Sequence, residues 1–195
     1  MTEQYNITEN LDSNIPSDDV ESENNIAGDD LPDVVVQVEK IAERQRKISA
    51  HIQLPHPVER VWKLLTDYEG LCDFIPNLAK SSLLEHPHGG IRLEQIGSQR
   101  LLKFNFSARV VLDLEEYFPT EIKFSMIEGD FKAFSGSWYF QADASAGEQP
   151  KTHVSYTIQV WPKLTMPISI IERRLSNDLR VNLLAIHQRL EELTG

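Results

Sequence analysis

Residues 166–193, MPISIIERRLSNDLRVNLLAIHQRLEEL, decide the fold of this chain. Apolar residues recur there every three or four positions, which is the spacing of one face of an α-helix. Thr165 can cap the start and Pro167 suits the first turn, so we predict one helix over residues 167–193, about 40 Å long at ~1.5 Å per residue. Its apolar stripe consists of Ile168, Ile171, Leu175, Leu179, Leu183, Ile186, Leu190 and Leu193. A stripe of this length needs a long apolar surface to lie on.

The rest of the chain offers such a surface, because much of it alternates apolar and polar residues as half-buried strands do. Residues 104–114 are the clearest case, with an apolar side chain at every even position. Residues 46–54 alternate in the same way, but the alternation that begins at Val34 falls out of phase near Ile41. We interpret residues 34–54 as one long bulged strand, with a short helix over residues 34–41 as the alternative.

Two short helices are predicted after this strand. Val58, Val61, Trp62 and Leu65 have helical spacing, and residues 71–76 read as a second short helix or a turn. Five or six antiparallel strands follow between residues 78 and 160, and Gly97-Ser98 marks either a bulge or a tight turn within them. The predicted fold is therefore α+β: a curved antiparallel sheet of six to seven strands around the long C-terminal helix, with space for an apolar ligand between them.

The charge of the chain lies mostly at its N-terminus. The net charge is −11, and residues 1–33 hold ten acidic residues and no Lys or Arg, which leaves −1 for residues 34–195. We predict a disordered acidic tail over residues 1–33 and one folded domain over residues 34–195. A domain this close to neutral lacks the basic surface of a nucleic-acid-binding protein, so direct nucleic acid binding is not expected.

Other features of the composition bear on the compartment. No apolar run approaches the ~20 residues that span a bilayer, and the acidic N-terminus does not resemble a signal peptide, so we predict no transmembrane segment. Cys72 is the single cysteine, which excludes an intrachain disulfide and favours a reducing, cytoplasmic compartment. We interpret Cys72 as a small buried hydrophobic residue.

Three motifs carry a resemblance to a known family. They are VWKLLTDYE at 61–69 followed by FIP at 74–76, FSARV at 106–110, and EGDF at 128–131 followed by GSW at 136–138. In this order they resemble the SRPBCC (START-like) superfamily, whose fold is the helix-grip fold, and within it the polyketide cyclase/dehydrase and coenzyme-Q-binding START-like group. With PKLTMP at 162–167, the pattern is similar to the cyanobacterial and plastid branch. The resemblance implies a cavity between the sheet and the long helix for a lipid or another apolar molecule.

No catalytic or metal-binding constellation emerges from the sequence, so we predict no catalytic residue, metal or cofactor. His86 and His88 flank Pro87 in a turn without a third ligand, and Glu115 and Glu116 are neighbours on a strand and face opposite ways. Arg109 lies on the polar side of its strand. It is either an ordinary surface residue or, if the strand curls, a partner for the polar head of a ligand.

The working hypothesis is the binding or transport of a hydrophobic small molecule: a lipid, an isoprenoid or a quinone-like compound. Residues 128–133 and the two short helices would gate access, and transient membrane contact is compatible with this role. The alternatives are a polyketide cyclase/dehydrase-type enzyme and a protein-interaction module that acts through an unknown partner. The predicted pocket residues are Phe74, Phe106, Val110, Phe124, Met126, Phe134, Trp138, Tyr156, Leu175 and Leu179.

Overall fold

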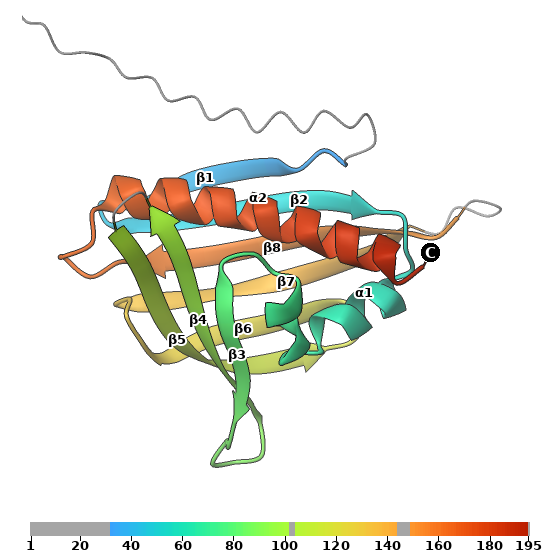
Figure 1. The fold of residues 1–195 in the computed structure, drawn as a ribbon, viewed down its shortest axis with the longest axis horizontal. Helices are drawn as coiled ribbons and strands as arrows, with labels where there is room; N and C mark the ends of the chain where they lie inside the picture. The colour runs from blue at the N-terminus through green and yellow to red at the C-terminus, as the bar shows by residue number, and fades with distance from the viewer. Residues whose placement is uncertain (1–31, 102–103, 144–148, 195) are drawn as a thin grey trace, which may run out of the picture. The chain divides into compact units, whose positions relative to one another are not determined.

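The computed structural model describes residues 32–101, 104–143 and 149–194, so the predicted acidic tail lies outside the described residues up to residue 31. Eight antiparallel strands form one curved sheet in the order β1-β2-β8-β7-β6-β5-β4-β3, and helix α2 (Ile168–Glu192) lies along it (Figure 1). This is the predicted helix-grip arrangement. The strands are β1 (Val35–Ala42), β2 (Gln45–Leu54), β3 (Leu78–Leu84), β4 (Ile91–Leu101), β5 (Phe104–Tyr117), β6 (Glu121–Gly129), β7 (Ala133–Asp143) and β8 (Lys151–Trp161).

The prediction of one long strand over residues 34–54 is wrong, and so is its helical alternative. The segment is a hairpin, in which β1 pairs antiparallel with β2 and Val35 lies opposite His51. The phase break near Ile41 is a register shift between Lys40 and Ala42, directly before the chain reverses. The sheet therefore has eight strands, and the short helices follow its second strand.

The short helices are α1 (Val58–Leu65) and the 3₁₀-helix η1 (Gly70–Asp73). The four apolar residues that predicted α1 are all buried. Within η1 only Leu71 is buried, whereas Cys72 is exposed and its thiol donates to the carbonyl oxygen of Glu69 at 3.2 Å. The prediction of a buried Cys72 is wrong because the tight turn of η1 directs Leu71 inward and its neighbour outward.

Helix α2 begins one residue later than expected. Pro167 occupies the N-cap position and no side chain caps the helix, so Thr165 does not have the predicted role. Most of the predicted stripe faces the sheet, with Ile171, Leu179, Leu183, Ile186 and Leu190 buried. Leu193 was wrongly included in the stripe, because it follows the helix at the C-cap position and is 56% exposed. None of the helices among the described residues is long and apolar enough to span a membrane.

Polar contacts hold α2 against the β1–β2 hairpin. Arg46 Nε lies 2.5 Å from a carboxylate oxygen of Glu172, and Arg180 donates to the carbonyl oxygen of Val34 at 3.0 Å. Arg44, in the turn between β1 and β2, donates to the carbonyl oxygen of Met166 at 2.7 Å. The helix is therefore anchored at this edge of the sheet, whereas β3, β4 and β5 lie at the other edge.

The two faces of the sheet differ in chemistry. Leu93 and Leu112 lie opposite each other on the inner face and are both buried. On the outer face of the same two strands, Arg92 forms two hydrogen bonds with the carboxylate of Asp113, at 2.7 and 2.9 Å. Gly97 lies within β4 and pairs regularly with Ala108 of β5, so Gly97-Ser98 is neither a turn nor a bulge of β4. The irregularity lies in β3, between Leu78 and Lys80.

Candidate functional site

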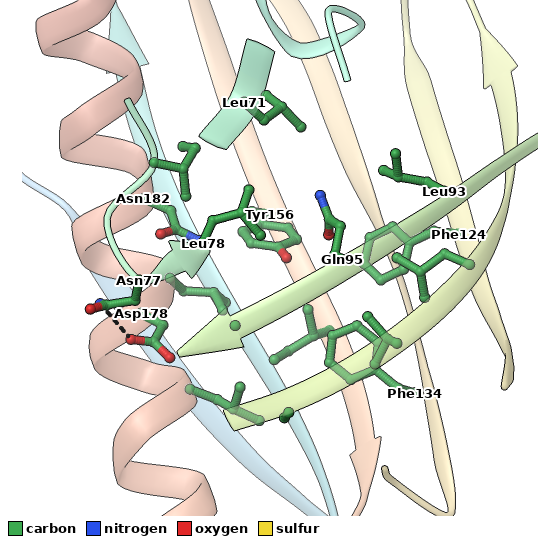
Figure 2. A pocket seen from close by; sticks show the side chains of 18 of the residues that line it. Leu71, Asn77, Leu78, Leu93, Gln95, Phe124, Phe134, Tyr156, Asp178 and Asn182 are labelled. Carbon is green, nitrogen blue, oxygen red and sulfur yellow. Dashed lines mark hydrogen bonds between the residues drawn. The ribbon is translucent and has the colours of Figure 1, made fainter. Parts of the chain in front are cut away.

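A cavity of about 220 Å³ lies between α2 and the inner face of the sheet (Figure 2). Strands β4 to β8 form one wall, α2 forms another, and α1, η1 and the segment that follows η1 close one end. Most of the lining side chains are apolar, among them Leu71, Leu78, Ala108, Leu114, Ile122 and Ile171.

The position of α2 explains why this space stays open. The helix packs against β1, β2 and α1. The curvature of the sheet then leaves room between the helix and strands β4 to β7. Leu175 shows the effect of this space between helix and sheet. It belongs to the same apolar stripe as Leu179, but it is only half-buried and lines the cavity.

Aromatic rings form the wall on the sheet side. The rings of Trp138 and Tyr156 are stacked, with centroids 3.7 Å apart and an interplanar angle of 6°. The Phe134 ring stacks on Phe124, with centroids 5.8 Å apart, and on Phe131, at 5.5 Å. We call these five residues the aromatic wall. Because aromatic rings combine a large apolar area with rigid geometry, they give this side of the cavity a fixed shape.

Gly136 makes room for the wall. It lies in β7 opposite Phe124, and a Cβ atom at this position would come within 2.6 Å of the Phe124 ring. The missing side chain lets the Phe124 ring lie across the backbone of β7. This explains the glycine of the GSW motif at 136–138.

Two tyrosines line the cavity and differ in their hydrogen bonding. The Tyr68 hydroxyl donates to the Glu116 carboxylate at 2.6 Å, and burial together with this hydrogen bond raises the pKa of Tyr68. The Tyr156 hydroxyl forms no hydrogen bond within the described part of the chain. Burial, and secondly the negative charge of Asp178, raise the pKa of Tyr156, so this hydroxyl stays protonated at neutral pH.

Other polar side chains reach the cavity from β4, α2 and the segment before β3. Gln95 and Asn182 line it together with Asn77 and Asp178, which lie 3.4 Å apart (Asn77 Nδ2 to Asp178 Oδ1). Arg174 also contributes to the lining. The cavity is thus an apolar chamber with a few polar groups, which is typical of small-molecule sites.

Comparison with known proteins identifies the family. A sequence model of the family described as polyketide cyclase/dehydrase and lipid transport matches residues 54–184, well over half of the chain. The chain belongs to this family. The match runs from the end of β2 into α2 and includes every residue that lines the cavity. The predicted superfamily is confirmed, whereas the coenzyme-Q-binding group and the cyanobacterial and plastid branch stay predictions.

Solved structures share the fold. A protein from Thermus thermophilus superposes with a TM-score of 0.63 at 20% identity and covers 76% of this chain and 99% of its own. The Zhui aromatase/cyclase from Streptomyces sp. R1128 has a TM-score of 0.62 at 17% identity, with 77% and 96% covered. A STAR-related lipid transfer protein from Xanthomonas axonopodis has a TM-score of 0.60 at 15% identity, with 80% and 98% covered.

At these identities the likeness shows the fold alone. Both cyclases and lipid transfer proteins occur among the proteins that share it. No curated protein matches this chain in sequence.

Seven of the ten predicted pocket residues line the cavity. Phe74 follows η1 and packs against the core without lining the cavity. Met126 also packs against the core, with its sulfur beside Gly129, and is not part of the lining. The side chain of Phe106 lies outside the described residues. The residues that do line the cavity are Val110, Phe124, Phe134, Trp138, Tyr156, Leu175 and Leu179, and their contact with a ligand stays a prediction.

Sequence reasoning missed the polar lining residues, as well as apolar ones such as Leu71, Leu78 and Phe131. Gln95 had a detectable signal, because it falls in the same alternation as Ile91 and Leu93 and is therefore a polar residue at an inward position of a strand. Asn182 and Asp178 flank the apolar stripe of the helix and had no comparable signal.

The other candidate residues lie away from the cavity. Arg109 is on the outer face, where its Nε lies 2.6 Å from Glu94 and its Nη1 lies 2.6 Å from Glu128. Of the two predicted roles for Arg109, the structure therefore has the surface residue and not the partner of a ligand's polar head. In the turn before β4, His86 Nδ1 accepts hydrogen bonds from the backbone amides of His88 and Gly90. Among the described residues, no three His, Cys, Asp or Glu side chains lie close enough together to hold a metal ion.

Proposed function

We propose that this chain binds and carries a hydrophobic small molecule, such as a lipid, an isoprenoid or a quinone-like compound, in the cavity between the sheet and α2. One observation carries the proposal: about 220 Å³ of mostly apolar space inside an otherwise packed core. The volume exceeds the ~150 Å³ of an apolar cavity that accepts benzene.

The energy of an unfilled cavity supports this function. At ~24 cal/mol per Å³, a closed and dry cavity of 220 Å³ would cost about 5 kcal/mol. This cavity is partly open to solvent, so about 5 kcal/mol is an upper bound. The net stability of a domain is only about 5–15 kcal/mol, so the free-energy cost of leaving this cavity empty is large by comparison. A bound apolar molecule would recover packing and bury its own surface at about 25 cal/mol per Å².

The chemistry of the lining supports binding over a cyclase reaction. The ionisable residues in the described lining are Tyr68, Tyr156, Arg174 and Asp178. Because the pKa values of both tyrosines are raised, mainly by burial, neither can act as a general base near neutral pH. Asp178 accepts a hydrogen bond from Asn77 and lies beside it at the helix side of the cavity (Figure 2).

Access is proposed at two places, beside η1 and beside the turn between β6 and β7. Leu71 of η1 and Phe131, in the short turn between β6 and β7, both contribute to the lining, and both segments are short connections between elements. A small displacement of either segment would open a path to the cavity.

The test is native mass spectrometry of protein purified from its own host, followed by solvent extraction. We expect an apolar molecule at near 1:1 stoichiometry. Leu175→Arg, which places a charge in the cavity, should abolish retention while the circular dichroism spectrum stays native. Ile170→Arg is the matched control, since Ile170 lies on the same helix and is 51% exposed. It should retain the molecule.

A second measurement covers a ligand lost during purification. A ligand present at 100 times its Kd stabilises the protein by about 2.7 kcal/mol, which raises the Tm of a chain of this size by roughly 5–11 °C. The proposal would be overturned by equal retention in folded Leu175→Arg. It would also be overturned by an empty protein whose Tm stays unchanged across a panel of lipids, isoprenoids and quinones.

A further inference from the structure

Some polar groups that face the cavity keep hydrogen-bonding capacity that the fold does not use. The Tyr156 hydroxyl is the first of them. Stacking on Trp138 fixes its ring, burial keeps the hydroxyl protonated, and no described residue accepts its hydrogen. Tyr68 differs from Tyr156 in this respect, because the Tyr68 hydroxyl already donates its hydrogen to Glu116.

Gln95 presents an acceptor to the same space. Ser81 donates its hydroxyl hydrogen to the carbonyl oxygen of Tyr68 at 2.6 Å, so the Ser81 oxygen can only accept from Gln95, whose Nε2 lies 3.3 Å away. This orients the amide: Nε2 must face Ser81 and Oε1 must face away from it. Gln95 thus offers the cavity a hydrogen-bond acceptor.

Asn182 completes the set from the helix side. It lines the cavity, and its amide forms no hydrogen bond within the described residues, so it can both donate and accept. In the view of Figure 2, Tyr156 lies between Gln95 and Asn182. We call Gln95, Tyr156 and Asn182 the polar set.

From this arrangement we infer that the natural ligand is uncharged and carries a hydroxyl group, as an alcohol or a phenol, that is seated at the polar set. The inference rests on the proposed function and names the chemical class of its ligand. A ligand hydroxyl seated there would accept from Tyr156 or donate to Gln95 Oε1, whereas a pure hydrocarbon would cover both groups and leave them unsatisfied.

The charges of the lining favour a neutral ligand. Arg174 and Asp178 are its charged members among the described residues, they have opposite sign, and they lie one turn apart on α2. The Asp178 carboxylate acts on Tyr156 electrostatically, and Gln95 turns an oxygen toward the cavity. A carboxylate or phosphate head at the polar set would therefore meet negative charge or partial negative charge from both residues.

Three probes with one ring system separate these possibilities. Naphthalene, 1-naphthol and 1-naphthoate are titrated by calorimetry into protein freed of co-purified molecules with a lipophilic resin. We expect 1-naphthol to bind more tightly than 1-naphthoate. The ratio of the naphthalene Kd to the 1-naphthol Kd should fall about tenfold in Tyr156→Phe, the effect of one buried hydrogen bond. Gln95→Met, which keeps the length of the side chain, should lower the same ratio.

Tyr139→Phe is the matched control, because Tyr139 lies beside Trp138 in β7 but faces outward and is 48% exposed. It should leave the ratio unchanged. Two outcomes would overturn this inference while cavity binding stands. In the first, naphthalene binds and Tyr156→Phe weakens the binding of naphthalene and 1-naphthol by the same factor. In the second, 1-naphthoate binds more tightly than 1-naphthol. If none of the three probes binds the unmodified protein, the proposed function fails first.

Discussion

Replacing Gly136 by alanine adds only one methyl group, but it should lower the stability of the protein strongly. The Cβ of the new residue would lie 2.1 Å from the carbonyl oxygen of Thr157, 2.6 Å from the Phe124 ring and 3.0 Å from the Cα of Ile158. Two of these atoms belong to the backbone of β8, which pairs with β7 along its length. They cannot move away without breaking the pairing of the two strands.

The magnitude follows from this geometry. Overpacking in a dense core costs about 1–3 kcal/mol, and contact with an immobile backbone places Gly136→Ala at the upper end, about 3 kcal/mol. For a chain of 150–250 residues, this lowers the Tm by roughly 6–12 °C. Urea unfolding followed by circular dichroism gives the free energy of unfolding, and differential scanning calorimetry gives the Tm.

Gly97→Ala is the matched control on the same face of the sheet. There the nearest atoms to the new Cβ would be the carbonyl oxygens of Asn77 at 3.7 Å and Ala108 at 3.9 Å, both ordinary contacts. Removing a glycine from the unfolded chain should then stabilise the protein by up to about 1 kcal/mol. A Gly136→Ala protein as stable as the unmodified one, or an equal loss in both variants, would refute the packing argument.

Two further predictions concern a buried tyrosine and a surface arginine. Burial and, to a lesser extent, the Asp178 carboxylate raise the pKa of Tyr156 above the ordinary value of ~10, so the free energy of unfolding should fall as the pH rises past about 10. Tyr156→Phe should make this decline shallower in urea titrations from about pH 8 to 11. Identical declines in the two proteins would contradict the raised pKa. Arg109→Leu should leave ligand retention in native mass spectrometry unchanged, because Arg109 pairs with Glu94 and Glu128 on the outer face. Its effect on stability should be small, since exposed ion pairs are screened by solvent. Lost retention would place Arg109 at the ligand instead.

Local patterns in the sequence predicted most of the elements and most of their faces. Steps of three and four residues predicted α2 and its buried stripe, and period-two alternation predicted which side of β5 faces the core. Both patterns arise because one side of each element meets apolar surroundings and the other meets water. Alternation does not record whether the chain continues or reverses, so the β1–β2 hairpin was mistaken for one bulged strand.

Which inward residues enclose open space becomes visible only in the folded arrangement. Tyr156 and Val154 share the inner face of β8 and the same alternation, yet Val154 is fully packed and Tyr156 borders the cavity. Likewise, Leu175 and Leu183 belong to one stripe of α2, but only Leu175 lines the cavity. Periodicity is a property of a single strand or helix, whereas a cavity depends on the distances between several of them. Here the curvature of the sheet and the anchoring of α2 at the β1–β2 edge create the space that no local pattern could reveal.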